Sequence, residues 1–252
     1  MPRKNRFLFL LAFLLALAVF AISAWKLADY YISGLRSQSR YEELAAMVTT
    51  APAETEETVP NTDILPEYQT LSEQNPHMVG WIQMDGTVID YPVVQTPEDP
   101  EYYLKRDFDG SRNERGCIFA DAACDVEHSD NVTVYGHNMG DGSMFAPLKH
   151  YTAESFWTEH PTFRFDTLKQ RRTYAVFAVF RTTASVGEGF AYHKFSDAVD
   201  EAEFDDFISQ CKTLSLYNTG ITPAYGDQTV CLSTCEYTRE NGRLVVAAVL
   251  QK

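Results

Sequence analysis

The pattern of apolar and polar positions divides the chain into three parts, and the first is almost purely apolar. Phe7–Trp25 contains nineteen residues without a charged side chain, and three cations lie within residues 1–6 before it. A helix of about 20 apolar residues spans a bilayer, and cations tend to keep the flanking end in the cytoplasm. The pattern predicts a cytoplasmic tail at 1–6, a transmembrane anchor at 7–25 and an extracellular remainder.

A cleaved signal peptide is the alternative interpretation of this apolar run. Ala21-Ile22-Ser23-Ala24 resembles the small-residue site at which signal peptides are cut. The apolar run is long for the core of a signal peptide, which favours an anchor that is kept.

The second part, residues 26–66, is expected to be a linker. Lys26 to about Arg40 continues as a helix beyond the anchor. From Tyr41 to Pro66 the chain is acidic, contains proline and has few large apolar residues. Such composition is typical of extended or disordered chain, because too little apolar surface is available to bury. We expect a stalk that acts as a spacer.

The third part, residues 67–252, alternates short apolar runs with turns. Tyr68 and Leu71 follow helical spacing at its start. Asp85-Gly86 separates two β-type runs, which predicts a hairpin. The predicted strands are Val79–Met84, Thr87–Val94, Gly116–Ala120, Asn131–Tyr135, Thr162–Phe165, Arg172–Thr182, Thr229–Cys235 and Leu244–Leu250.

One predicted strand and one predicted helix suggest the architecture. Arg172–Thr182 is apolar on both faces, which suits a sheet covered on both sides or a closed barrel. Strict alternation would place Tyr174, Val176, Ala178 and Phe180 on one face and Ala175, Phe177 and Val179 on the other. Asp197–Leu214 carries an apolar stripe that includes Val199, with acidic residues opposite. Phe156–His160 predicts a shorter helix. A mainly β fold, barrel or sandwich, with helical insertions is expected.

Composition and charge narrow the possible functions. The net charge of −14 argues against a general nucleic-acid binder, which would present a basic face. The five cysteines are an odd number, which in an exported protein indicates a free and reactive thiol. The spacing of cysteine and histidine lacks the pairs of a zinc site, so we expect no structural metal.

Candidate chemistry centres on Cys235, at the end of one predicted strand, and Arg243, at the head of the next. If these strands pair, the thiol and the guanidinium share a rim. His137 follows another strand, and Gly136 before it allows a sharp turn into a cleft. A thiolate can attack a carbonyl while an imidazole exchanges its proton. A guanidinium can stabilise the resulting oxyanion.

Each candidate also has an interpretation without chemistry. His137 could cap its own loop, and Arg243 could be a surface cation paired with Glu236 or Glu240. A redox pair between Cys231 and Cys235 conflicts with strand geometry, which holds residues four apart too far away for a disulfide. The remaining cysteines are expected to be structural and the remaining histidines to lie at the surface: Cys117, Cys124, Cys211 and Cys231; His77, His128, His150, His160 and His193.

The segments around these residues resemble the sortase family. Leu232-Ser233-Thr234-Cys235 followed by Arg243 resembles its Leu-x-Thr-Cys strand end with a downstream arginine. Tyr135-Gly136-His137-Asn138-Met139 and Asp141–Phe145 resemble the histidine segment of the class B branch. The likeness covers about Glu67–Lys252. It implies a closed sortase-type β-barrel with helical insertions, in a catalytic domain at residues 67–252.

The resemblance also implies a function and roles for residues. A class B sortase is a membrane-anchored cysteine transpeptidase, whose cysteine, here Cys235, attacks the Thr carbonyl of a C-terminal sorting motif in a secreted protein. An amine of a cell-wall precursor, or a pilin lysine, would then resolve the thioacyl-enzyme. His137 would be the acid and base, and Arg243 would stabilise the oxyanion. Tyr135, Ser233, Thr234 and Glu236 would line the substrate groove. No cofactor is implied.

Two other functions remain open from the sequence. A cysteine endopeptidase would form the same acyl-enzyme on Cys235 but resolve it with water. A membrane-tethered binding module would use the barrel only to display loops, and would not depend on the Cys235 thiol.

Overall fold

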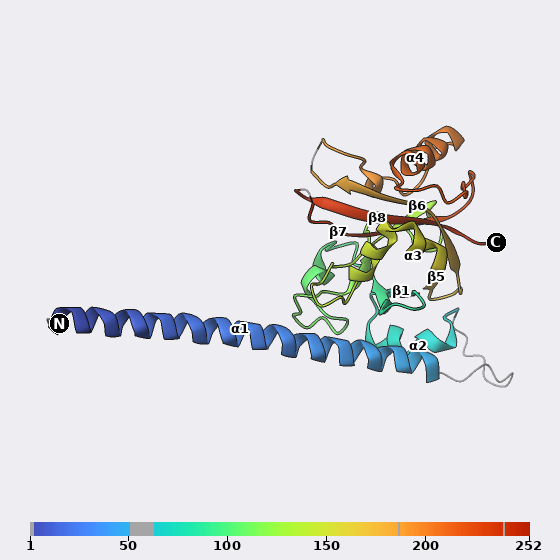
Figure 1. Cartoon of the computed structure of the whole chain (residues 1–252). Helices are drawn as coiled ribbons and strands as arrows, with labels where there is room; N and C mark the ends of the chain where they lie inside the picture. Colours follow the sequence, from blue (N-terminus) through green and yellow to red (C-terminus); the bar gives the residue numbers. More distant parts are fainter. Residues whose placement is uncertain (1–2, 51–62, 186, 239) are drawn as a thin grey trace. The chain divides into compact units, whose positions relative to one another are not determined.

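A long N-terminal helix and a β-barrel are the main features of the chain (Figure 1). The structure, a computed structural model, describes residues 3–50, 63–185, 187–238 and 240–252. The chain divides into two compact units, Met1–Arg40 and Tyr41–Lys252. Helix α1 (Arg3–Thr50) forms the first unit and contributes its last residues to the second. Within the described residues, Phe7–Thr49 is long and apolar enough to cross a membrane.

The end of α1 differs from the predicted stalk. The helix continues to Thr50, so the prediction of extended chain is wrong over residues 41–50. Tyr41 and Leu44, three residues apart on one helix face, are only 4% and 5% exposed. The ring of Tyr41 meets that of Tyr91 edge to face, with 5.0 Å between centroids. Burial of these side chains favours the helix. The most acidic part of the expected stalk, residues 51–62, lies outside the described residues.

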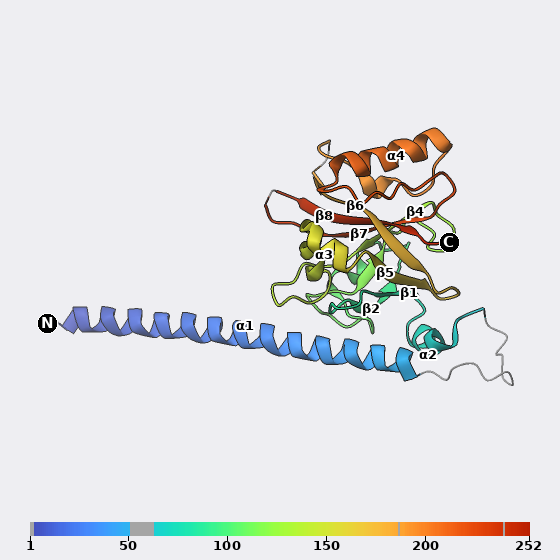
Figure 2. The ribbon, with the colours of Figure 1, turned by 45° about the vertical axis from the view of Figure 1, so that its right-hand side comes forward.

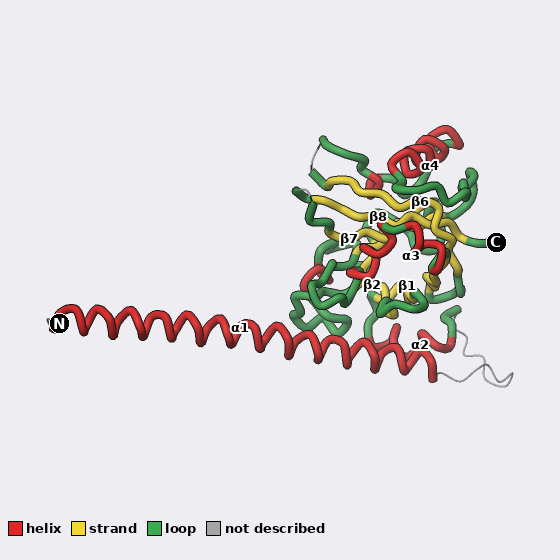
Figure 3. The backbone as a smooth tube through the Cα atoms, viewed as in Figure 1, coloured by secondary structure: helices red, strands yellow, loops and turns green. Residues whose placement is uncertain are grey.

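Eight strands close into a barrel in the order β1-β2-β3-β4-β7-β8-β6-β5, as the family resemblance implied. The strands are yellow in Figure 3. Their bounds are β1 Met78–Gln83, β2 Asp90–Val94, β3 Ile118–Ala120, β4 Asn131–Tyr135, β5 Thr162–Thr167, β6 Thr173–Thr183, β7 Thr229–Cys235 and β8 Gly242–Leu250. The helices after α1 are α2 Pro66–Gln74, α3 Glu154–Glu159 and α4 Glu201–Leu214, with 3-10 turns η1 Tyr102–Lys105, η2 Ala146–Thr152 and η3 Tyr192–Lys194. Strands β1 and β2 form the hairpin predicted at Asp85-Gly86, and Gly86 has φ +75°.

Apolar side chains form two layers, one inside the barrel and one under α4. Helix α4 lies against β6 on the outside of the barrel (Figures 1 and 2). Strand β6 contributes to both layers, but a bulge between Val176 and Ala178 interrupts its alternation. Val179 therefore joins Tyr174 and Val176 in the inner layer, and Ala178 joins Phe177 in the outer one. The bulge makes the predicted division by strict alternation wrong beyond Phe177.

Helix α4 begins later than the sequence pattern predicted. It starts at Glu201, after Asp200, whose carboxylate accepts a hydrogen bond of 3.0 Å from the Glu203 N–H. This cap satisfies a backbone donor that has no partner within the helix. Val199 lies before the helix and is 88% exposed, so its assignment to the apolar stripe is wrong. Phe204, Phe207, Ile208 and Cys211 form the buried face.

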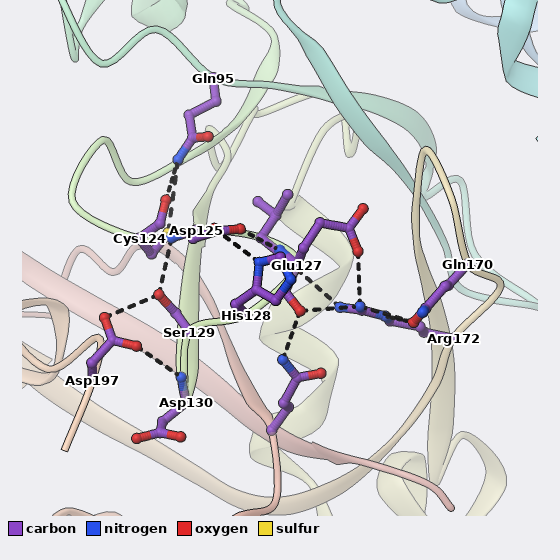
Figure 4. Close-up of polar contacts among 12 residues, drawn as sticks. Gln95, Cys124, Asp125, Glu127, His128, Ser129, Asp130, Gln170, Arg172 and Asp197 are labelled. Carbon is purple, nitrogen blue, oxygen red and sulfur yellow. Dashed lines mark hydrogen bonds and ion pairs between the residues drawn. The ribbon is translucent and has the colours of Figure 1, made fainter. Parts of the chain in front are cut away.

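The loop between β3 and β4 is held by a polar network (Figure 4). The Arg172 guanidinium donates to the Val126 carbonyl and to the Glu127 carboxylate, each at 2.9 Å. The Ser129 hydroxyl donates to Asp197 at 3.1 Å. The His128 side chain is 82% exposed and contacts Asp125, in agreement with its prediction as a surface residue. The network fixes the loop that begins at Asp121, directly after β3.

Candidate active site

Cys235 and Arg243 form the last pair of the ladder between β7 and β8. The strands are antiparallel, and the two residues stand directly opposite each other. The Cβ atoms of such partners lie about 5 Å apart on the same face of a sheet. Cys235 is partly exposed, whereas the other four cysteines are buried. The thiol and the guanidinium therefore share one rim, as the sequence predicted.

His137 reaches this rim because β4 runs parallel to β7. Tyr135 is level with Ser233, so His137 and Cys235 each lie two residues beyond that pair. Gly136 continues the ladder by donating from its N–H to the Ser233 carbonyl at 3.1 Å. Residues 98 apart in sequence (235 − 137) are thus brought to neighbouring strand ends.

Gly136 is required here for a reason other than the predicted one. It has no positive φ in the structure. A Cβ at this position would instead lie 2.6 Å from atoms of both Ile118 and Phe145. Close packing under the strand end, and not a left-handed turn, explains the glycine beside His137.

Side-chain hydrogen bonds join the His137 segment to the Cys235 segment. The Thr234 hydroxyl donates to the Gly136 carbonyl at 2.7 Å. The Asn138 side-chain amide donates to the Cys235 carbonyl at 2.9 Å. The residues on both sides of His137 are therefore tied to Cys235 or its neighbour, which limits relative movement of the two strand ends. The role of Asn138 was not predicted, because its partner is a backbone atom.

The imidazole of His137 has a defined partner on one side. Its Nε2 lies 2.7 Å from the carbonyl oxygen of Leu104, in η1. A carbonyl oxygen only accepts hydrogen bonds, so Nε2 must carry the hydrogen. This leaves Nδ1 as the ring nitrogen that can exchange a proton with a reacting group. The alternative interpretation, in which His137 caps its own loop, does not match this long-range contact.

Arg243 is held by the turn before β8. Its Nη1 donates to the carbonyls of Gly242, at 3.0 Å, and Asn241, at 3.3 Å. The same Gly242 carbonyl also accepts a hydrogen bond from the Glu236 N–H at 2.9 Å. The guanidinium can therefore keep one nitrogen on the backbone while others face a substrate.

One pocket of about 320 Å³ collects these groups. His137, Cys235 and Arg243 line it together with Tyr135, Ser233 and Thr234, so six of the seven predicted site residues meet there. Glu236 is not among the lining residues. Its carboxylate instead accepts from Thr238 at 2.6 Å and lies 4.0 Å from Arg181.

The hydroxyl groups in the pocket wall have partners of their own. The Ser233 hydroxyl lies 2.6 Å from that of Tyr192, and burial raises the pKa of Tyr192 to about 12. The Tyr135 hydroxyl donates to the Asp121 carboxylate at 2.7 Å. Burial, followed by this hydrogen bond, raises the pKa of Tyr135 above its ordinary value, so both phenols stay neutral at physiological pH.

Asp121 and Glu101 add carboxylates to the pocket that sequence reasoning did not single out. Gln95 fixes the backbone at Asp121 by donating to its carbonyl at 2.6 Å. The pocket therefore has acidic groups in addition to the cationic Arg243. Their positions in space show that they belong to the pocket.

An ion pair between Arg115 and Asp141 ties the segment before β3 to the loop after His137. The Arg115 side chain is 3% exposed. Burial of Asp141 opposes ionisation, but hydrogen bonds from Ser143 and Arg115 outweigh it and lower the pKa of this carboxyl. The pair stays ionised at neutral pH. It holds the loop after His137 in addition to the hydrogen bond from Asn138 to Cys235.

A family model for the sortase domain matches residues 82–251, a range that contains the whole pocket. The chain belongs to the sortase family. Sortase B of Listeria monocytogenes is 32% identical over 240 residues, which is 94% of each chain. A crystal structure of sortase B from Bacillus anthracis in complex with AAEK1 has 34% identity and a TM-score of 0.76, covering 88% of this chain and 99% of that one.

A second solved structure supports the class B branch. The Staphylococcus aureus sortase B–substrate complex has a TM-score of 0.77 and 28% identity, covering 88% of this sortase and 99% of that chain. The predicted class B resemblance is thereby confirmed. Members of the family are cysteine transpeptidases, so this sortase is a cysteine transpeptidase of the class B type.

Proposed function

We propose that this sortase cleaves a C-terminal sorting motif after Thr in secreted proteins and transfers the protein to an amine of a cell-wall precursor. The observation that carries the proposal is the convergence of the Cys235 thiol, the His137 imidazole and the Arg243 guanidinium on one pocket. A nucleophile, a proton carrier and a fixed cation are the groups that acyl transfer through a thioester requires.

The geometry suggests how the groups divide the work. Nδ1 of His137 takes the proton of the Cys235 thiol, and Sγ attacks the Thr carbonyl. The carbonyl electron pair moves to the oxygen, where Arg243 stabilises the charge. His137 delivers a proton from Nδ1 to the departing amine as the C–N bond breaks, which leaves a thioester on Cys235. The incoming amine then attacks the thioester and loses a proton to Nδ1. The C–S bond breaks as the amide forms, and Nδ1 returns the proton to the sulfur, which regenerates the thiol. Nε2 keeps its hydrogen on the Leu104 carbonyl throughout.

Substrate contacts are assigned to the remaining pocket residues. Tyr135, Ser233 and Thr234 form the wall beside the nucleophile. We retain Glu236 as a candidate at the edge of the groove, because it follows Cys235 directly although its carboxylate turns toward Arg181. The acidic Asp121 and Glu101 favour a substrate with an uncharged or cationic side chain at that end.

Amine incorporation distinguishes transpeptidation from hydrolysis. We expect the enzyme to convert members of a library of fluorogenic sorting peptides and, with added triglycine, to yield the Thr–triglycine product. Mass spectrometry of the products measures the ratio of aminolysis to hydrolysis. A product that never contains the amine, at any triglycine concentration, would identify an endopeptidase. The same assay with a pilin-derived lysine peptide as acceptor distinguishes pilin polymerisation from wall anchoring.

We further propose that residues 7–25 cross the membrane with the N-terminus in the cytoplasm and the barrel outside. The length of α1 and the apolar run at residues 7–25 support the crossing, and the cations within residues 1–6 support the orientation. Cys235 supplies a probe, since it is the partly exposed cysteine of the five. In protoplasts, a membrane-impermeant maleimide should label the full chain, and Cys235→Ala should remove the label. Labelling that appears only after lysis would contradict this orientation.

A further inference from the structure

The Leu104 carbonyl contacts two parts of the structure that are distant in sequence. It accepts the hydrogen bond from His137 Nε2 at 2.7 Å and belongs to η1, in the segment between β2 and β3. Gly116, later in that segment, lies against the same carbonyl. A Cβ on Gly116 would be 2.6 Å from the Leu104 oxygen and 2.7 Å from the Tyr103 oxygen. Both are backbone atoms, so neither could move aside by rotating a side chain.

The backbone around Gly116 is matched to η1 in two further ways. Gly116 has φ +61°, which favours glycine. The next residue, Cys117, donates from its N–H to the Tyr103 carbonyl at 3.0 Å. Gly116 and Cys117 thus run alongside η1 and set the position of its carbonyls.

Tyr41 holds the Gly116 carbonyl. Its hydroxyl donates to the Gly116 carbonyl at 3.1 Å, and its ring is buried against Tyr91. Tyr41 belongs to α1, yet it forms part of the same compact unit as the barrel. Contacts therefore run without interruption from the end of the N-terminal helix through Gly116 and the Leu104 carbonyl to His137.

We propose that Gly116 and Tyr41 are positioning residues for the reaction, which hold the Leu104 carbonyl where it fixes the Nε2–H tautomer and the orientation of His137. Neither residue lines the pocket. The inference rests on the proposed role of His137 in catalysis. It assigns the residues that follow the anchor a function in the chemistry, in place of the spacer predicted from their composition.

Gly116→Ala tests the proposal, with Gly220→Ala as its matched control. Gly220 also has a positive φ, +76°, but a Cβ there would meet no atom within 4 Å. Both variants carry similar backbone strain, and only Gly116→Ala should displace the Leu104 carbonyl. We expect kcat to fall roughly 10- to 100-fold in Gly116→Ala, as small displacements of catalytic groups do. KM should change much less, and Gly220→Ala should keep the wild-type kcat.

Tyr41→Phe provides a milder variant that keeps the ring and removes one hydrogen bond. Its control is Tyr68→Phe, which removes a buried hydroxyl that donates to the Asp166 carboxylate, on β5, at 2.7 Å. Both changes should lower the melting temperature. Only Tyr41→Phe should also lower kcat, by a few-fold. Equal kcat in the two variants would overturn the part of the proposal that concerns Tyr41.

The tautomer itself is measured without substrate. In ¹⁵N-histidine-labelled enzyme, with the His137 signals assigned from their loss in His137→Gln, neutral His137 should be the Nε2–H tautomer. Gly116→Ala should introduce the Nδ1–H tautomer, and Gly220→Ala should not. An Nδ1–H tautomer in the wild type, or an unchanged tautomer and kcat in Gly116→Ala, would refute the proposal. If no peptide is turned over, the proposed function fails. The NMR comparison would still show whether Gly116 fixes the tautomer of His137.

Discussion

Cys235→Ala should abolish peptide cleavage and amine transfer, with a loss of at least about 10³-fold in kcat, since removal of a covalent nucleophile leaves only binding and electrostatic effects. The thiol stands opposite Arg243 and lines the same pocket as His137. The measurement is kcat and KM with a fluorogenic sorting peptide, together with a thermal melt to show that the variant is folded.

Cys231→Ala is the matched control for this loss. Cys231 lies on the same strand but is fully buried, and burial raises the pKa of its thiol well above the ordinary range. Cys231→Ala should lower the free energy of unfolding by about 0.5–3 kcal/mol, as is usual for a core truncation. Its kcat should equal that of the wild type. Turnover by Cys235→Ala above a few per cent of wild type, or an equal loss in Cys231→Ala, would show that Cys235 is not the nucleophile.

Arg243→Lys should lower kcat by about 10²- to 10³-fold, the range seen when a donor to the oxyanion is removed. The substitution keeps the charge. However, a lysine ammonium is a compact group, whereas the guanidinium can bind the carbonyls of Asn241 and Gly242 through Nη1 and present other donors to the substrate. KM should change less than kcat, because the oxyanion exists only in the transition state and the intermediate.

Arg181→Lys is the matched control, because it makes the same change at a neighbouring arginine. Arg181 lies on β6 opposite Leu244, beside Arg243, and is not among the residues that line the pocket. Arg181→Lys should keep kcat within about twofold, because the half-buried Arg181 side chain lies outside the pocket. Full activity in Arg243→Lys would mean that charge alone is sufficient at this position and that the donor arrangement has no role.

Strand positions could be predicted from the sequence where apolar runs end at clear turns. β4 and β7 have the predicted bounds, and β8 begins two residues earlier than predicted, at Gly242. This sufficed to place Cys235 and Arg243 on one rim, because a short connection favours antiparallel pairing. The parallel pairing of β4 with β7, which brings His137 to that rim, joins distant segments. Only the resemblance to the sortase family predicted that His137 would lie at the same rim as Cys235 and Arg243.

Other features depend on tertiary contacts that leave no pattern in the sequence. The bulge in β6 shifts which face Ala178 occupies, and because residues 174–180 are all apolar or aromatic, no change of pattern marks it. Tyr41 and Leu44 sit in a stretch whose composition indicates a linker, and only their burial makes them part of the domain. The Leu104 carbonyl is a backbone group that every residue has, so its role beside His137 could not be inferred from residue type.

The most direct test of the account is mass spectrometry of the enzyme during turnover of a sorting peptide. A thioester adduct of the peptide's N-terminal fragment should form on Cys235. It should be absent from Cys235→Ala and should be discharged by triglycine with formation of the amide product. The adduct should be located by digestion at low pH, where the thioester persists. Turnover without any adduct on Cys235, or an adduct that triglycine does not discharge, would contradict the central claim.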